Sequence, residues 1–395
     1  MVIYYLCQLG NVTIFSCSIE LTNRNCNAIL PIIPIRSEER INHLAKKSLD
    51  RRESRQFLVT IYDVAKKAGV SKSTVSRVIT GSGSIKDSTR HRIEKAMREL
   101  NYTPSYLAQG IRTGKTKTIA LMVEETSNLY YNELLYSVEK IATENDYMVF
   151  LLNGSANGDH AQKYMAWLRQ RQVDGVICCF YRDNAITDEL YRMSKTLPVV
   201  FLDNPQPLDS RPGISCIGTD GLNDTAEIVR YLHSTGSRRI AFIGINDIRN
   251  ITYRYLGYRA SMTACGCDLD EKLVFFDDPQ PPNESHFTLG GRAAQILMAQ
   301  PAPPDAIISA TDMLAVGALQ YLQENGYRVP DQVRLTGYDN IILSTMCTPK
   351  LSTMSQPIDQ IAKEAMHVLI RKIQQGSDYN HSVLLKSKFI RREST

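Results

Sequence analysis

The 395-residue sequence lacks most of the patterns that identify an enzyme, a disulfide-rich protein or a metalloprotein. It has no phosphate-binding GxxxxGK[ST] loop, no GxGxxG after its first buried strand, no GxSxG and no HExxH motif. Its nine cysteines match no zinc spacing and no disulfide framework, and its seven histidines are scattered. We therefore expect no enzyme, no metal site and no cofactor, and thiols that stay reduced.

The sequence also lacks an export signal and a convincing membrane span. The first 18 residues, MVIYYLCQLGNVTIFSCS, are fairly apolar, but Gln8 and Asn11 interrupt them, and there is no basic n-region or small-residue cleavage site. These absences predict a cytoplasmic protein without a membrane partner.

Residues 1–58 form an extension that we interpret as foreign to the folded protein. The stretch from Arg36 to Arg55 is charged and irregular. TTG and GTG, which encode leucine and valine, are both usable bacterial start codons, and on this basis Leu58 or Val59 leads us to predict that translation starts near residue 58 or 59. The alternative is a genuine N-terminal arm that is disordered.

Positive charge is concentrated in one short segment. Residues 59–115 hold eleven basic and four acidic side chains, so this segment has a net charge of +7, whereas residues 116–395 sum to −5. A small basic head on a mildly acidic body is typical of a protein that binds a polyanion.

The basic head contains the pattern helix, tight turn, helix, supporting helix. Thr60 and Asp63 mark the start of the first helix, Gly69 its end, and Ser71 the cap of the second. The apolar positions recur at helical spacing: Ile61, Val64, Ala65 and Ala68, then Val75, Val78 and Ile79, then Ile93, Ala96, Met97 and Leu100.

This arrangement predicts a helix-turn-helix whose second helix enters the DNA major groove. Lys72 and Ser73 would lie at base edges with Arg77 one turn on, and Thr74 and Ser76 would donate to phosphates. The predicted DNA-binding residues are Thr60, Tyr62, Ser71, Lys72, Ser73, Thr74, Ser76, Arg77 and Ile111. The alternative is a solvated amphipathic hairpin in an all-helical domain.

The segment IYDVAKKAGVSKSTVSRVI resembles the lactose-repressor/galactose-repressor (LacI/GalR) family of bacterial transcription regulators. The segment ELNYTPSYLAQGIRTGKTKTIAL is similar to the family's hinge. The resemblance implies a hinge helix at 105–116 that orders on operator DNA and inserts an apolar side chain, here Ile111, into the minor groove. Without DNA, the same residues are an interdomain linker.

From residue 118 onward, apolar runs alternate with helical stretches, which predicts βαβ units and parallel sheets. The runs are TIALMV, YMVFLL, VDGVICCF, PVVFLD, RIAFIG, DAIISA and VRLTGYD, and the helices lie near 131–145, 159–171, 222–235, 253–266, 288–300 and 312–325. We interpret Gly154, Gly158 and the pair Gly290–Gly291 as turns.

The predicted fold is a small all-α helix-turn-helix head with a hinge, joined to a two-lobed α/β core that resembles periplasmic binding proteins. The predicted boundaries are 59–104 for the head, 105–116 for the hinge, 117–216 plus 356–379 for the N-terminal lobe, and 217–355 plus 380–395 for the C-terminal lobe. A ligand would bind at the carboxyl ends of the strands, in the cleft between the lobes.

Matching of positions to the family implies an effector site whose carboxylates, guanidinium and aromatic rings suit a polyol. The implied residues are Glu124, Glu125, Tyr130, Tyr131, Asp203, Arg254, His286, Phe287, Thr311, Asp312 and Asp339. Alternatives stay open for some of them. Asp312 could cap its helix, His286 could be an exposed loop residue, and the two tyrosines could belong to the core or to the cleft rim.

The family resemblance therefore implies a homodimeric repressor of carbohydrate-utilisation genes that binds a palindromic operator and is released by a sugar-like effector. The chain ends at SKFIRREST without a leucine heptad for tetramers. Two alternatives remain: a regulator with a nucleobase or other metabolite as co-repressor, and a solute-binding protein without a DNA role.

Overall fold

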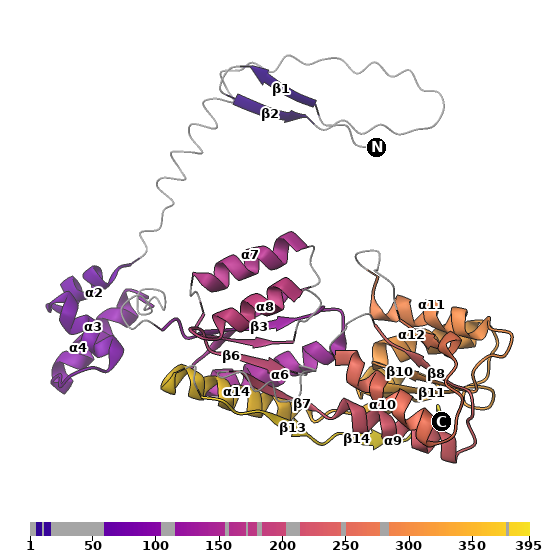
Figure 1. Ribbon diagram of the computed structural model, residues 1–395. Coiled ribbons are helices and arrows are strands. Elements are labelled where there is room, and N and C mark those ends of the chain that lie inside the picture. Colours follow the sequence, from indigo (N-terminus) through magenta and orange to yellow (C-terminus); the bar gives the residue numbers. More distant parts are fainter. Residues whose placement is uncertain are drawn as a thin grey trace. The chain divides into compact units, whose positions relative to one another are not determined.

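The computed structural model describes residues 5–9, 12–16, 59–103, 115–154, 158–170, 173–179, 184–202, 214–245, 250–276, 284–376 and 379–395. The chain divides into two compact units, Met1–Thr103 and Pro104–Thr395 (Figure 1). None of the helices in the described ranges is long and apolar enough to cross a membrane.

The first unit contains a three-helix head. Its helices are α2 (Ile61–Ala68), α3 (Lys72–Thr80) and α4 (Asp87–Glu99). They bury the apolar positions that the helical spacing predicted: Val64, Ala65, Ala68, Val75, Val78, Ile93 and Ala96 form the core, with Ile79, Met97 and Leu100 packed against it. A core of mostly small side chains brings the three helices close together.

Two short strands precede the head in the chain. Strands β1 (Tyr5–Leu9) and β2 (Val12–Ser16) pair antiparallel with Leu9 opposite Val12. We predicted no folded structure here; β-branched and aromatic residues in VTIFS favour an extended backbone. The rest of residues 1–58 lies outside the described residues, as does the hinge from 104 to 114, and the start of translation near residue 58 or 59 stays a prediction.

The second unit contains two six-stranded sheets, and the predicted α/β architecture with parallel sheets is confirmed. The first sheet runs β13-β7-β6-β5-β3-β4, with every neighbouring pair parallel. Its strands are β3 (Thr118–Val123), β4 (Met148–Asn153), β5 (Gly175–Cys178), β6 (Val199–Leu202), β7 (Ser215–Thr219) and β13 (Val383–Leu385).

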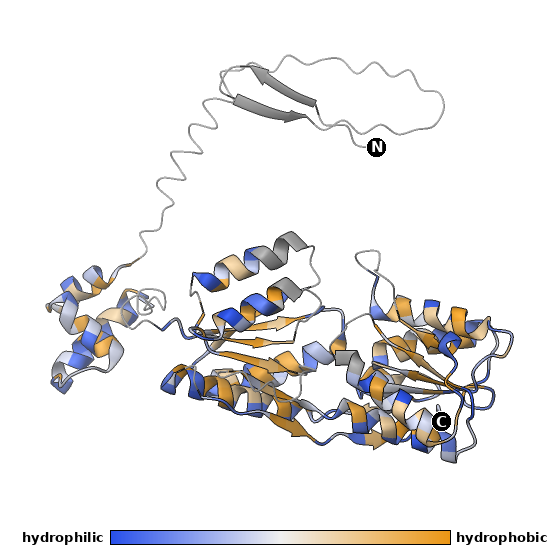
Figure 2. Cartoon of the chain, viewed as in Figure 1, coloured by the Kyte–Doolittle hydropathy of each residue, from blue (hydrophilic) through white to orange (hydrophobic). Residues whose placement is uncertain are grey.

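Helices cover both faces of this first sheet, which with them forms the N-terminal lobe. In Figure 1, α7 (Gly158–Arg169) and α8 (Asn184–Met193) lie on one face, and α6 (Leu129–Glu144) and α14 (Ile358–Gln375) on the other. Two apolar clusters, one on each face, account for this arrangement. Figure 2 shows the strands as hydrophobic runs, as strands buried on both faces should be.

The second sheet runs β14-β12-β11-β10-β8-β9 and forms the C-terminal lobe; β14 pairs antiparallel with β12, and the other pairs are parallel. Its strands are β8 (Ile240–Ile243), β9 (Val274–Phe275), β10 (Ala306–Ser309), β11 (Arg334–Asp339), β12 (Ser352–Ser355) and β14 (Lys388–Ile390). Its helices are α9 (Gly221–Ser234), α10 (Asn250–Ala264), α11 (His286–Met298), α12 (Asp312–Glu324) and α13 (Leu343–Met346), with a 3-10 turn at Glu271–Leu273.

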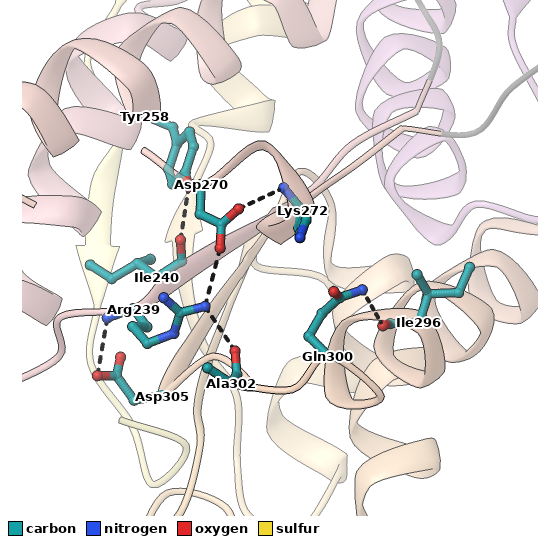
Figure 3. Close-up of polar contacts among 9 residues, drawn as sticks. All are labelled: Arg239, Ile240, Tyr258, Asp270, Lys272, Ile296, Gln300, Ala302 and Asp305. Atoms are coloured by element: carbon teal, nitrogen blue, oxygen red, sulfur yellow. Dashed lines mark hydrogen bonds and ion pairs between the residues drawn. The ribbon is translucent and has the colours of Figure 1, made fainter. Parts of the chain in front are cut away.

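Polar contacts fix the first strand of the C-terminal lobe (Figure 3). The backbone N–H of Arg239 donates to Asp305, its guanidinium donates to Asp270 and to the Ala302 carbonyl, and Tyr258 Oη donates to the Ile240 carbonyl at 2.8 Å. These hydrogen bonds hold the start of β8 against the loop at Asp305 and against α10, although Arg239 Nε and Asp305 Oδ1 are buried without a partner among the described residues.

The chain passes between the two sheets three times, and two passages lie a few residues beyond their predicted positions. Strand β7 continues to Thr219, so the first crossing follows residue 219 rather than 216. Strand β13 pairs with β7, so the third crossing lies between Leu385 and Lys388 rather than near 380. The second crossing follows Ser355.

Candidate functional site

The start of α2 is fixed by Thr60 and Asp63. The backbone N–H and the hydroxyl of Thr60 donate to Asp63 Oδ2 at 2.8 and 2.7 Å. The Thr60 hydroxyl, and then its backbone N–H, hold the pKa of Asp63 below its ordinary value. These two hydrogen bonds fix the first turn of the helix that presents Tyr62.

The tight turn between α2 and α3 has the glycine that its geometry requires. Gly69 has a φ of 65°, in the left-handed region that disfavours residues with a Cβ. Ser71 then caps α3 by accepting from the Thr74 N–H at 3.2 Å, and its hydroxyl lies 2.7 Å from that of Ser73 and 2.8 Å from that of Thr74. Three hydroxyls therefore gather at the N-terminus of α3.

The outer face of α3 carries the predicted DNA contacts. Lys72, Ser73 and Arg77 are exposed, whereas Thr74 and Ser76 are half-buried beside the core residues Val75 and Val78. The buried valines fix which face of α3 turns outward. That face can donate hydrogen bonds and positive charge to a nucleic acid.

Tyr62 of α2 and Lys72 of α3, ten residues apart, lie side by side in the structure. Lys72 Nζ donates to Tyr62 Oη at 3.2 Å and lies 4.7 Å from the centre of its ring. Tyr62 remains 63% exposed, so the pair forms a polar, cationic surface at the junction of α2 and α3. By contrast, Lys67 pairs with Glu99 of α4 at 2.8 Å, and this ion pair lowers the pKa of Glu99.

In the second unit, Glu124 and Glu125 directly follow β3 and are both buried. Ser127 Oγ donates to Glu125 Oε1 at 2.6 Å. Glu124 Oε1 lies 3.9 Å from His286 Nε2 of the other lobe. His286 is only 2% exposed and is the first residue of α11, after the cap Ser285, so the alternative of an exposed loop histidine is wrong.

Tyr130 and Tyr131, in the first turn of α6, are buried and meet edge to face with centroids 5.4 Å apart. They belong to an apolar cluster that also contains Met313 and Ile341 of the C-terminal lobe, with Phe287 packed against it. These aromatic side chains therefore form an apolar contact between the lobes.

Arg254 of α10 is buried with its guanidinium 3.6 Å from the centre of the Tyr338 ring, and its Nη1 donates to the Ala310 carbonyl. Asp339, at the end of β11, accepts from Gln356 Nε2 at 2.8 Å. It has a φ of 121°, which costs a residue with a Cβ about 1–3 kcal/mol. Backbone strain of this kind concentrates at functional sites.

Asp339 also lines a groove of about 730 Å³. Helix α6 contributes Glu133 and Tyr136 to its wall, and the second crossing contributes Gln356. Burial raises the pKa of Glu133. Gln356 was not predicted; the only signal was its position two residues before the helical stretch that begins at Ile358.

Thr311 and Asp312 have structural roles at the start of α12. Thr311 is the cap and accepts from the Leu314 N–H at 3.3 Å, so the alternative in which Asp312 caps the helix is wrong. Asp312 is fully buried and accepts from Thr353 Oγ1 at 2.6 Å and from the Ile341 N–H at 2.9 Å. These contacts occupy its carboxylate and disfavour a direct role in ligand binding.

Asp312→Asn is expected to remove part of the pH dependence of stability. Burial raises the pKa of Asp312 to about 6 from an ordinary 3.8, so the folded state holds this proton more tightly than the unfolded chain does. The stability that the proton adds is full below pH 3.8 and is lost as the pH rises through 6, by about 2 kcal/mol between pH 4 and 6. Urea unfolding should show the advantage of wild type over the variant shrinking by that amount.

Asp331→Asn is the matched control for this titration, because the Asp331 side chain is 72% exposed. The change in the stability difference between pH 4 and 6 should be clearly larger for Asp312→Asn than for this control. A constant difference for Asp312→Asn would contradict the raised pKa.

Two predicted residues, Ile111 and Asp203, lie outside the described residues. Among the residues that the structure does describe, no three His, Cys, Asp or Glu side chains gather as a metal site would require. Of the predicted effector residues, Glu124 lies close to His286. Asp339 lies beside Gln356, which was not predicted.

Comparisons with known proteins agree with this architecture. Residues 60–105 match the model of bacterial regulatory proteins of the lacI family, and residues 229–395 match a periplasmic binding protein-like domain. The ribose operon repressor of Escherichia coli (strain K12) is 32% identical over 319 residues, which are 80% of this chain and 94% of that protein.

Two solved structures are similar over most of their length. The complex of the transcriptional regulator CelR with cellobiose has a TM-score of 0.63 and 28% identity, and the match covers 85% of this chain and 100% of that one. The lac repressor dimer bound to operator and the anti-inducer ONPF has a TM-score of 0.71 and 22% identity, with 85% and 98% covered. The second likeness concerns the fold alone.

Proposed function

The chain belongs to the lacI family of bacterial regulatory proteins, and from this premise we propose that it is a homodimeric repressor that a sugar-like effector releases from a palindromic operator. Its relatives are transcriptional regulators, so the chain is a DNA-binding regulator and not an enzyme. The genes that we propose it represses are those of carbohydrate utilisation.

The outward face of α3 carries the DNA-binding part of the proposal. Lys72, Ser73 and Arg77 are exposed there, because Val75 and Val78 anchor the opposite face in the core. A rigid helix with exposed cationic and hydroxyl side chains near its N-terminus suits readout of base edges in the major groove. Ile111 remains the proposed wedge in the minor groove.

The polar groups between the lobes support a sugar-like effector. Glu124, Glu125 and Asp339 offer acceptors to hydroxyl groups, and Arg254 offers a donor. Among the similar proteins, one is a ribose operon repressor and another is solved as a cellobiose complex. A polyol that bridges Glu124 and Asp339 would favour one arrangement of the lobes over another, which is what a released repressor requires.

Exposed apolar side chains support the homodimer. Tyr136 of α6 and Ile342 before α13 are 73% and 55% exposed, and both line the 730 Å³ groove. Met346 of α13 is exposed as well, as are Met148 and Phe150 of the edge strand β4. A second copy that covered these side chains would remove apolar surface from water. A dimer with two-fold symmetry presents two identical heads, so the operator that it binds is expected to be palindromic.

Operator titration tests the proposal. DNA from upstream of the gene itself would be titrated with the full chain by fluorescence anisotropy at several salt concentrations, with and without D-ribose, cellobiose and nucleobases. We expect tight, salt-sensitive binding that a sugar weakens. Binding that requires a nucleobase would instead establish a co-repressor, and the absence of salt-sensitive binding to any DNA would overturn the proposal.

Asp339→Asn is expected to reduce the effector's shift in operator affinity at least about tenfold, or 1.4 kcal/mol. Asparagine has nearly the same shape as aspartate, so the variant removes the charge and leaves the backbone strain at this position as it is in wild type. Operator affinity without the sugar should stay unchanged. The control is Asp331→Asn at an exposed site; a normal response in Asp339→Asn would show that this carboxylate does not contact the effector.

A further inference from the structure

Tyr338, near the end of β11, makes contacts in two directions although it is almost completely buried. Its hydroxyl lies 2.6 Å from Asp224 Oδ2 of α9 and 3.0 Å from Thr219 Oγ1, the last residue of β7. Because a carboxylate only accepts, Tyr338 donates its proton to Asp224, and the Thr219 hydroxyl donates to the Tyr338 oxygen. The tyrosine therefore joins the C-terminal lobe to the end of the N-terminal lobe's sheet.

The ring of Tyr338 supports Arg254, a proposed effector contact. The guanidinium lies 3.6 Å from the ring centre. Gly221 leaves the arginine room, because a Cβ at Gly221 would come within 3.1 Å of Arg254 Cγ. Arg254 thus packs against both the ring of Tyr338 and the start of α9.

All three crossings between the lobes meet near this tyrosine. Thr219 is on the first crossing. On the second, Gln356 Oε1 lies 3.4 Å from the Thr219 hydroxyl, and its amide donates to Asp339. On the third, Ser387 is buried, and it acts on Asp224 rather than on the tyrosine itself. Tyr338 therefore contacts the first crossing directly through Thr219, and the other two crossings lie next to its partners Thr219 and Asp224.

The Asp224 carboxylate depends on this hydroxyl. Burial raises its pKa, while Tyr338, Ser387 and Arg254 oppose that effect and the neighbouring Asp220 adds to it. A buried carboxylate that loses a charge-assisted hydrogen bond is costly. We call the hydrogen bonds of the Tyr338 hydroxyl with Asp224 and Thr219 the tie. The buried Asp224 carboxylate needs this donor, and Tyr338 is held in the core, so both partners favour the tie.

We propose that Tyr338 is a positioning residue for the effector response, because its ring orients Arg254 while its hydroxyl ties the first crossing to the C-terminal lobe. The effector part of this inference rests on the proposed function. A ligand that moves Arg254 moves the ring of Tyr338, and through its hydroxyl the crossing at Thr219 and Asp224.

Hydrogen exchange of backbone amides tests the tie without any ligand. Tyr338→Phe keeps the ring and loses both hydroxyl contacts, and Thr219→Val removes the donor on the crossing while Asp224 keeps its partner. In both variants of the full chain we expect amides of 216–224 and 354–360 to exchange at least about fivefold faster than in wild type. Amides of β10 should keep their rates.

The matched control is Tyr258→Phe. Tyr258 is a second fully buried tyrosine of the same lobe, and its hydroxyl donates to the Ile240 carbonyl rather than to a crossing (Figure 3). Tyr258→Phe should leave the ratio of amide exchange rates between the crossings and β10 as it is in wild type. Unchanged crossing amides in Tyr338→Phe and Thr219→Val would overturn the proposal, and so would an equal increase in Tyr258→Phe, which would indicate general loss of stability.

Operator titration with D-ribose and cellobiose adds the functional readout. For whichever sugar acts on wild type, Tyr338→Phe should reduce the shift in operator affinity at least about tenfold and leave affinity without the sugar within about threefold. A full response in Tyr338→Phe would overturn the positioning role. Failure of wild type to bind operator would count against the proposed function instead. The exchange measurement would still show whether the Tyr338 hydroxyl holds the crossings.

Discussion

Gly317→Ala is expected to lower the free energy of unfolding of the second unit by about 3 kcal/mol. Gly317 lies within α12, and a Cβ at this position would overlap the Phe287 carbonyl oxygen of α11. The obstacle is helix backbone, so relief requires α11 and α12 to separate and loosens the core between them. For a body of this size, thermal unfolding should fall by roughly 6–12 °C.

Gly291→Ala supplies the matched control, in the facing helix α11. Its Cβ would lie 3.4 Å from the Gly317 carbonyl oxygen, which is an ordinary contact. Alanine is a better helix former than glycine by about 1 kcal/mol, so Gly291→Ala should be neutral or slightly stabilising. Equal melting temperatures for Gly317→Ala and Gly291→Ala would contradict the close approach of the two helices.

These glycines show where a sequence pattern misleads. We interpreted Gly290–Gly291 as a turn, because glycine pairs are usually breakers. Both lie inside α11, and a Cβ at Gly290 would overlap the Leu314 carbonyl oxygen of α12. The prediction was wrong because the reason for glycine is a neighbouring helix that folding brings close, and local sequence does not contain it.

The predicted elements that the structure contains are those with a strong local signal. Apolar runs such as those at 118–123 and 240–243 are strands, and capped amphipathic stretches such as 61–68 are helices. Helix α14 (Ile358–Gln375) was missed although Ile361, Ala362 and Ala365 repeat at helical spacing. This helical spacing was present in the sequence, but the segment that follows residue 355 was interpreted only as the start of a passage back to the N-terminal lobe.

Strand β12 (Ser352–Ser355) could not be predicted from its own residues. Ser352 and Thr353 are fully buried, where polar side chains are costly without partners. Their partners are remote in sequence: the Ser352 N–H donates to Ser394 Oγ, and the Thr353 hydroxyl donates to Asp312. The same holds for the candidate site, where Glu124 with His286 and Tyr338 with Asp224 are contacts that only the fold creates.

Arg77→Ala is expected to weaken operator binding by about 1–3 kcal/mol, roughly 5- to 150-fold. The side chain is exposed on α3, one turn beyond Lys72, and no core contact is lost when it is shortened, since Val75 and Val78 fill the interior. The slope of log binding constant against log salt concentration distinguishes two kinds of contact. Loss of a phosphate contact would reduce the magnitude of this slope by about one, whereas loss of a base contact would relax sequence preference and leave the slope nearly unchanged.

Arg98→Ala separates this contact from general electrostatics. Arg98 is exposed on α4 and carries the same charge within the same +7 head, but it is not on the recognition helix. Anisotropy titrations at 50, 100 and 200 mM salt should give a much larger loss for Arg77→Ala than for Arg98→Ala. If the two losses are equal, the head binds DNA through its net charge, and α3 is not the helix that reads the operator.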